Sequence, residues 1–316
     1  MVRTTVITAG EMKRLMWIAE SNYGVTPTGA LGLAAEYYSI KDDSDFAVVP
    51  HWLGSNRSYT STTRGPIKAG FTVKAVARAN SVSPAYNWVN FFALNAFGAT
   101  TGLTEHLPSF SSVVDIQEVT GGTVHDYFLF NGCKINKLVI GATDPGKIVT
   151  FDATVLARLP TWSASKTFAG LQAVTVGADP SAVTTDPITW SGILQYNLGG
   201  AGLANWAPRK WSLTVDNKLV VEPANLLGAD SANYSVANTL EEGQRDIILD
   251  VTLPARDQGL QTAKRLGTAM TAVTIPIGDK VITLTGGTFQ ANDYPEYKQD
   301  VNEESAKIIF QNLTIA

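Results

Sequence analysis

The sequence has little cysteine and little charge. Cys133 is the only cysteine among 316 residues, so no disulfide can form within the chain and no oxidising compartment is implied. Charged residues make up 16% of the chain, below the roughly 25% of average globular domains, and the net charge is −4. The sequence therefore contains no stripe of basic residues that could bind nucleic acid. The polar surface must come from Thr, Ser, Asn and Gly, a mix that suits β-structure and packed assemblies.

Long hydrophobic runs are also missing. The first residues, MVRTTVITAGEMKRLMWIAES, contain no apolar stretch of the roughly 7–15 residues that a secretory signal needs. No run of about 18 apolar residues occurs anywhere. We therefore expect no membrane anchor.

One segment has the spacing of a phosphate-binding loop, Gly141-Ala-Thr-Asp-Pro-Gly-Lys-Ile148. Ile148, however, stands where the hydroxyl residue that reaches magnesium should be. The residues after it are β-branched or aromatic, so no helix would present its N-terminus to a phosphate. Asp144-Pro145-Gly146 is ordinary turn chemistry, and we predict a hairpin here.

Other chemical candidates are scattered. His51, His106 and His125 lack metal-ligand spacing, and Cys133 is interpreted as a small buried residue. The acidic pairs Glu241-Glu242 and Glu303-Glu304 are interpreted as solvated loops, because paired catalytic carboxylates converge from separate elements. We expect no catalytic residue, no cofactor and no metal, and hence no enzyme.

Tryptophans gather in one part of the chain: Trp162, Trp190, Trp206 and Trp211. Stacked on a β-sandwich they could form a carbohydrate platform. Packing in the core or at an interface is the competing interpretation, because Trp buries a large area and is enriched at interfaces.

Helix signals are few. The clearest is 84–97, PAYNWVNFFALNAF, with Ser83 as N-cap, Pro84 in the first turn and Gly98 as the stop. Its large apolar residues cover most of its circumference, which predicts burial. A second candidate is 257–270, and residues 11–20 predict either a short helix or an arm that orders on assembly.

Strand signals dominate the remainder. The predicted strands are rich in Val, Ile, Thr and Phe, and Gly121-Gly122 and Gly278-Asp279 predict hairpin turns between them. The expected class is mainly β, a sandwich or barrel. The predicted strands are 71–78, 110–119, 123–130, 134–141, 147–157, 211–221, 245–253, 271–276, 280–285 and 307–315.

The chain also looks doubled, with one order of strand, helix, hairpin and strands in each half. FTVKAVAR (71–78) precedes the first helix much as LDVTLPAR (249–256) precedes the second; a competing alignment pairs FDATVLAR (151–158) with LDVTLPAR. We expect two tandem related units, each with one short helix. The predicted divisions are an arm with the first strands (1–60), a first unit (61–158), a connecting segment (159–205) and a second unit (206–316).

Four segments together resemble the tail tube proteins of long-tailed bacteriophages. ESNYGVTPTGALG (20–32) looks like their N-terminal E-x-x-Y-G-x-T-P arm. Residues 70–100 resemble their strand and buried helix. Residues 130–158, beginning FNGCKINKLVIG, resemble a block of two strands, and residues 211–253, beginning WSLTVDN, resemble a later strand pair. The segments cover most of the chain in the expected order.

The resemblance implies a structural virion protein and not an enzyme. Such subunits join edge to edge into rings, and the rings stack into a hollow tube that conducts DNA without binding it specifically. A duplicated member implies a trimeric ring with pseudo-sixfold symmetry, although a hexamer is possible. Implied partners are further copies, the tape-measure protein, the tail terminator and tail-tip proteins; the location is the virion tail, assembled in the host cytoplasm. The arm, 1–60, is expected to be loose in the monomer.

Two other classes stay open beside this one. A β-sandwich binding module, either a virion decoration protein or a carbohydrate-binding protein, would be a soluble monomer or small oligomer. An enzyme would require a cleft with titratable groups of shifted pKa.

Overall fold

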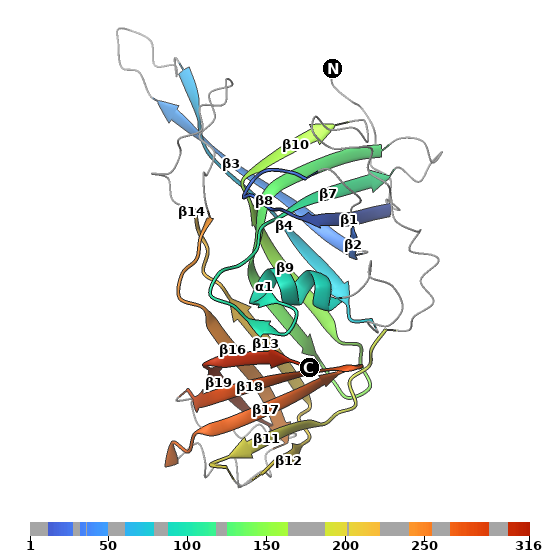
Figure 1. Cartoon of the computed structure of the whole chain (residues 1–316), viewed down its shortest axis with the longest axis vertical. Helices are drawn as coiled ribbons and strands as arrows, with labels where there is room; N and C mark the ends of the chain where they lie inside the picture. The colour runs from blue at the N-terminus through green and yellow to red at the C-terminus, as the bar shows by residue number, and fades with distance from the viewer. Residues whose placement is uncertain are drawn as a thin grey trace.

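The fold is mainly β, as expected from the strand signals (Figure 1). A computed structural model of the chain supplies the coordinates. It describes residues 12–27, 32–35, 37–49, 61–78, 88–117, 125–163, 187–200, 202–221, 240–254, 266–290 and 303–316. In Figure 1, β1–β4, β7 and β10 occupy one end of the molecule, and β11–β13 and β16–β19 occupy the other.

The longest strand, β8 (His125–Ala142), belongs to two sheets. Its first half pairs with β7 (Phe110–Gln117) and β10 (Leu159–Ser163). Its second half pairs with β9 (Thr150–Ala157) and β13 (Lys210–Asp216). The strand β8 changes partners after Gly132. The φ of Gly132 is 59°, a backbone conformation that glycine adopts at little energetic cost.

Further strands extend both sheets at this end of the molecule. Beyond β7 lie β1 (Met12–Ala19) and then β2 (Gly32–Ala35). Beyond β9 lie β4 (Ser61–Val76) and then β3 (Tyr37–Val49). All of these pairings are antiparallel.

The other end of the molecule is built around β18 (Lys280–Phe289) in the same manner. Its first part pairs with β17 (Met270–Ile277) and β20 (Asn312–Ile315), and its last residues pair with β19 (Glu303–Phe310). β11 (Leu194–Leu198) and β12 (Ala204–Trp206) extend the sheet beyond β17. β16 (Asp246–Pro254) lies between β19 and β13, so one continuous sheet runs β3-β4-β9-β8-β13-β16-β19.

Four short strands complete the described pairings. β5 (Gly98–Ala99) pairs with β6 (Gly102–Leu103), which meets β20. β14 (Val220–Val221) pairs with β15 (Leu240–Glu241).

One helical segment fills the space between the sheets. It comprises a π-helix, η2 (Val89–Ala93), followed by α1 (Leu94–Phe97), and it ends at Gly98 with φ of 99°. Phe92 stacks on Phe151 of β9 at 4.8 Å between ring centroids, and Phe91 meets Phe110 of β7 edge-on. The predicted buried helix is confirmed from Trp88 onward; Ser83 and Pro84 lie outside the described residues.

Three predictions about elements need correction. Residues 12–19 form β1 and no helix: Leu15 and Met16 are fully buried, and pairing along all of β7 overrides the local helix signal. The predicted strands 123–130 and 134–141 are parts of β8, because Gly132 bends the strand without ending it. Of the predicted helix 257–270, residues 255–265 lie outside the description, a turn occupies Gly267, and Met270 already begins β17.

We predict that Gly132→Ala destabilises the protein by about 2–4 kcal/mol, through left-handed backbone strain and overpacking. An added Cβ would lie 2.9 Å from Arg158 Cβ and 3.0 Å from Tyr23 Cζ. Gly146 supplies the matched control, since its φ is 79° but nothing lies within 4 Å of an added Cβ. Gly146→Ala should therefore cost only about 1–2 kcal/mol.

Urea unfolding of the two variants beside the parent measures this difference. Equal losses at the two positions would show that the contacts around the bend do not constrain it.

Candidate interaction edges

The titratable candidates from the sequence do not converge. His51 lies outside the described residues, and His125 begins β8. The His106 ring is mostly exposed, with Nδ1 3.8 Å from Glu242 Oε2. Within the described ranges, no group of three His, Cys, Asp or Glu side chains could hold a metal ion.

The segment Gly141–Ile148 begins in the last two residues of β8 and continues through a turn toward β9, as predicted. Its amides are already engaged: the Gly146 amide donates to the Trp190 carbonyl at 2.9 Å, and the Lys147 amide donates to the Asp144 carbonyl at 3.1 Å. Because a phosphate loop needs free amides, this turn is not one.

Cys133 is fully buried directly after the bend in β8. Burial raises the pKa of its thiol well above the ordinary value, and the nearby Glu20 carboxylate raises it further. The thiol is therefore held in its protonated, unreactive form.

Three of the four clustered tryptophans are core residues. Trp190, Trp206 and Trp211 are almost fully buried, and Trp190 meets Trp211 edge-on at 6.4 Å. The side chain of Trp162 lies outside the description. Buried indoles cannot stack on a sugar, so at these three positions the packing interpretation is confirmed.

The two ends of the molecule are joined by backbone pairing between β8 and β13, which we call the joint. It runs from Lys137 opposite Asp216 to Ala142 opposite Trp211. Alternate side chains along it are buried: Leu138, Ile140, Ala142, Trp211, Leu213 and Val215. The apolar side chains of both ends thus form one core cluster.

Asn217 ends the joint with a set of polar bonds. Its backbone amide donates to the Asn136 carbonyl at 2.7 Å. Its side-chain Nδ2 donates to the Ile135 and Ala96 carbonyls at 2.9 and 3.0 Å. Its Oδ1 accepts a 2.7 Å bond from Arg245 Nε, so this buried amide is fully used.

Glu242 forms a second polar contact between the two ends of the molecule, which we call the clasp. Its Oε1 accepts from Lys134 Nζ at 2.8 Å and from the Leu107 amide at 2.9 Å. Both side chains of the ion pair are only 14% exposed. The expectation of a solvated Glu241-Glu242 loop is thus wrong for Glu242, which the fold places against β8. Glu303 and Glu304, also expected in a loop, begin β19.

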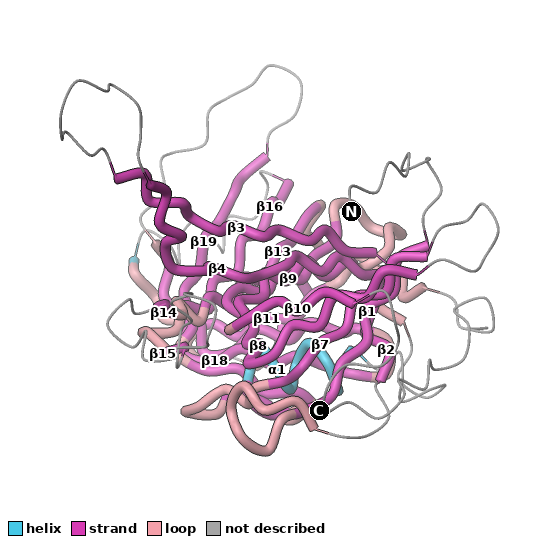
Figure 2. The backbone as a smooth tube through the Cα atoms, turned by 90° about the horizontal axis from the view of Figure 1, so that it is seen from above, coloured by secondary structure: helices cyan, strands magenta, loops and turns pink. Residues whose placement is uncertain are grey.

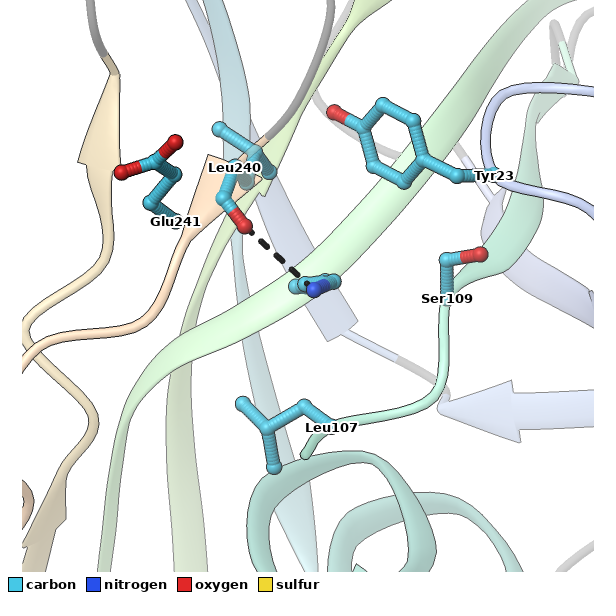
Figure 3. A pocket seen from close by; sticks show the side chains of 6 residues that line it. Tyr23, Leu107, Ser109, Leu240 and Glu241 are labelled. Atoms are coloured by element: carbon cyan, nitrogen blue, oxygen red, sulfur yellow. Dashed lines mark hydrogen bonds between the residues drawn. The ribbon is translucent and has the colours of Figure 1, made fainter. Parts of the chain in front are cut away.

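A pocket of about 330 Å³ lies beside this clasp (Figure 3). Tyr23, Leu107, Ser109, Lys134, Leu240 and Glu241 line it. Its cation, Lys134, donates to the Leu240 carbonyl at 3.3 Å as well as to Glu242. Burial raises the pKa of Tyr23, so its phenol stays neutral. These partners make the pocket part of the clasp, with no nucleophile and base in hydrogen-bond contact among its lining residues.

The segment after β1 is hydrogen-bonded to the rest of the protein. Glu20 accepts bonds from the Gly24 and Gly132 amides at 2.8 and 2.9 Å and from the Ser111 hydroxyl at 2.5 Å. The expectation that the 1–60 arm is loose in the monomer is therefore wrong for residues 12–27. Glu20 instead fixes this segment to the bend of β8.

The continuous sheet ends in two strand edges that have no described partner. β3 pairs with β4 on one side, and no described strand pairs with its other side. Figure 2 shows β3 on the outside of β4, with the far end of this pair reaching away from the body. At the other end of the molecule, Thr288 and Phe289 of β18 pair with β19, and no described strand lies on their second side. Such edges are templates for pairing with another chain.

A scan against protein-family models gives no match, and neither does a search of curated proteins. In the part of the chain that the structure describes, no helix is long and apolar enough to cross a membrane.

We predict that Cys133 reacts with a thiol reagent such as DTNB about 100-fold more slowly in the native protein than in the urea-unfolded protein, because reaction requires local unfolding. The low rate should persist to about pH 9, above the ordinary thiol pKa. Prompt native labelling would contradict the buried position.

We predict that Glu242→Gln lowers the free energy of unfolding by about 1–3 kcal/mol, because two donors lose a charged acceptor. Glu105, which is exposed in the neighbouring loop, supplies the control, and Glu105→Gln should stay within about 0.5 kcal/mol of the parent. Urea unfolding checks both variants. A loss at Glu242 no larger than that at Glu105 would show that the clasp contributes nothing to stability.

Proposed function

We propose that this chain is a tail tube protein: copies join edge to edge into rings, and the rings stack into the hollow tube of a long-tailed phage virion. The observation that carries the proposal is a repetition of strand pairings. Two sets of strands follow one another along the chain with the same order of pairing. One edge of each set pairs with the other set, and among the described residues the second edge of each set has no partner strand.

The repetition supports two related units, 12–163 and 194–316. In the first, β1 pairs with β2 and β7; in the second, β11 pairs with β12 and β17. β8 pairs with β7, β9 and β10 as β18 pairs with β17, β19 and β20. β4 lies between β3 and β9 as β16 lies between β13 and β19.

The registers agree as well as the order. Phe71 opposite Val155 matches Leu249 opposite Ile308, and two residues further Val73 opposite Ala153 matches Val251 opposite Ala306. This agreement supports the alignment of FTVKAVAR with LDVTLPAR. FDATVLAR occupies β9, which corresponds to β19, so the competing alignment loses its support.

The bends in β8 and β18 also correspond. Gly286 in β18 has φ of 70°, and partners change directly after it, as after Gly132 in β8. The Arg158 amide donates to the Asn131 carbonyl at 2.9 Å beside the first bend, and the Gln311 amide donates to the Thr285 carbonyl at 3.1 Å beside the second.

These boundaries differ from the expected connecting segment, 159–205. β10 joins the first unit, because it pairs with β8. β11 and β12 join the second unit, because β11 pairs with β17. The proposed connection shrinks to 164–193.

Edges that repeat in one chain favour closed rings. The joint uses the β8 edge of the first unit and the β13 edge of the second. The edges left are those of β3, equivalent to β13, and of β18, equivalent to β8. Joining them between copies continues the same sheet, and closure removes both of these edges. We favour three chains with pseudo-sixfold symmetry, with a hexamer as the alternative stoichiometry.

The solvent-facing side of the continuous sheet would line the lumen. Thr72, Thr154, Ser212 and Thr214 lie on this side, opposite the buried positions of their strands. Its charges are of mixed sign, with Lys74 and Asp152 paired at 3.5 Å. Hydroxyls and balanced charges give DNA phosphates few cations to hold, which suits passage without specific binding. The tape-measure, tail terminator and tail-tip proteins would be the other partners.

We predict that the purified protein at high concentration forms rings or hollow tubes in negative-stain electron microscopy, with three chains in each ring. Tubes form because stacking of rings is head-to-tail and therefore open-ended. Monodisperse small particles across a range of salt and protein concentration would overturn the proposal and would favour a binding module.

A further inference from the structure

We infer that the contact between copies repeats the joint inside the chain, with Ser44 at the β3 edge of one copy opposite Gln290 at the end of β18 of the next. The inference rests on the proposed function, and it goes beyond that function by naming the two edges and their register.

The joint inside the chain supplies the template. Its pairing ends at Asp216 opposite Lys137, and the next residue, Asn217, donates its backbone amide to the Asn136 carbonyl at 2.7 Å. Asn136 and Asn217 therefore mark one end of the contact between units.

The counterpart of Asn217 follows from the β3–β4 register. Asp216 faces Asp246 where β13 pairs with β16, and Asp43 faces Lys68 where β3 pairs with β4. Asn217 follows Asp216 as Ser44 follows Asp43. Ser44 therefore stands at the same place on the β3 edge, and its pairing with Ile67 engages only the β4 side of the strand.

The counterpart of Asn136 follows from β18. Ile135 faces Val155 of β9, and Phe289 faces Ile308 of β19. Asn136 follows Ile135 as Gln290 follows Phe289. The Gln290 amide donates to the Lys307 carbonyl at 2.9 Å, which continues the β19 ladder and leaves the opposite side of the backbone facing outward.

Leu266 supplies an independent observation at the same place. Its side chain is 75% exposed, the highest exposure among the large hydrophobic residues that the structure describes. Phe110 opposite Cys133 matches Met270 opposite Gly287, so Leu266 occupies the place of His106. In the first unit, Glu242 from the loop before β16 lies beside this place and accepts a hydrogen bond from the Leu107 amide, although the His106 ring stays mostly exposed. Contact with another copy would bury Leu266, which would account for an apolar side chain in solvent.

Cysteine cross-linking tests the register. Two chains, Ser44→Cys and Gln290→Cys, both carrying Cys133→Ala, are mixed, assembled and treated with a short bismaleimide. Partners across a strand pair lie within reach of such a reagent, because their Cα atoms are about 5 Å apart. We expect at least about 10-fold more covalent dimer than from Gln290→Cys mixed with Asp144→Cys, whose thiol would lie on the exposed turn after β8.

Two controls accompany the cross-linking experiment. A chain with Lys137→Cys and Asp216→Cys, which face each other in the joint, should close an internal link in the unassembled monomer, which shows that the joint survives substitution. A chain with both Ser44→Cys and Gln290→Cys should give a ladder that stops at three chains. On the unmodified protein, amide hydrogen exchange should fall in β3 and in residues 288–290 on assembly, while exchange in β1 is unchanged.

The outcomes separate the two claims. Rings or tubes without the Ser44–Gln290 link, and without new amide protection at these edges, would overturn the inferred register and leave the proposed function standing. Failure to assemble at all would overturn both.

Discussion

Backbone hydrogen bonding along β8 is the constraint on which this structure depends. Every amide and carbonyl in a strand needs a partner, and β8 meets that need with one set of strands before Gly132 and another after it. The left-handed conformation of Gly132 makes the change possible without ending the strand. Glu20 then holds the bend, because its carboxylate accepts a hydrogen bond from the Gly132 amide. One glycine and one carboxylate thus connect two sheets and place the far edge of β8 where β13 can use it.

Both apolar and polar groups stabilise the joint between β8 and β13. Buried side chains such as Leu138 and Leu213 supply the nonspecific part of the stabilisation. Asn217 and Glu242 add directional bonds at one end, and each leaves an unsatisfied buried partner if it is displaced. Such polar groups favour one register over its neighbours, because a shift of one residue would move every buried side chain to the solvent side.

The proposed assembly would also account for the low charge of the chain. A strand edge in a monomer is usually protected by charge, proline or a covering loop. A subunit whose edges match those of its own internal joint protects them by pairing with further copies. The proposed ring therefore needs no chemistry that the joint within one chain does not already use, and burial of Leu266 would follow from the same contact.

The sequence by itself determined the class and the local elements. Period-two alternation predicted strands such as β9, and the apolar run after Trp88 predicted a buried helix, because both signals come from neighbouring residues. The turn chemistry of Asp144-Pro145-Gly146 excluded a phosphate loop for the same reason. Only the tertiary structure decided that 12–19 is a strand, that β8 continues through Gly132 and that Glu242 is largely buried against Lys134. Those outcomes depend on partners up to about a hundred residues away, and pairing between distant strands leaves no periodic signal in either one.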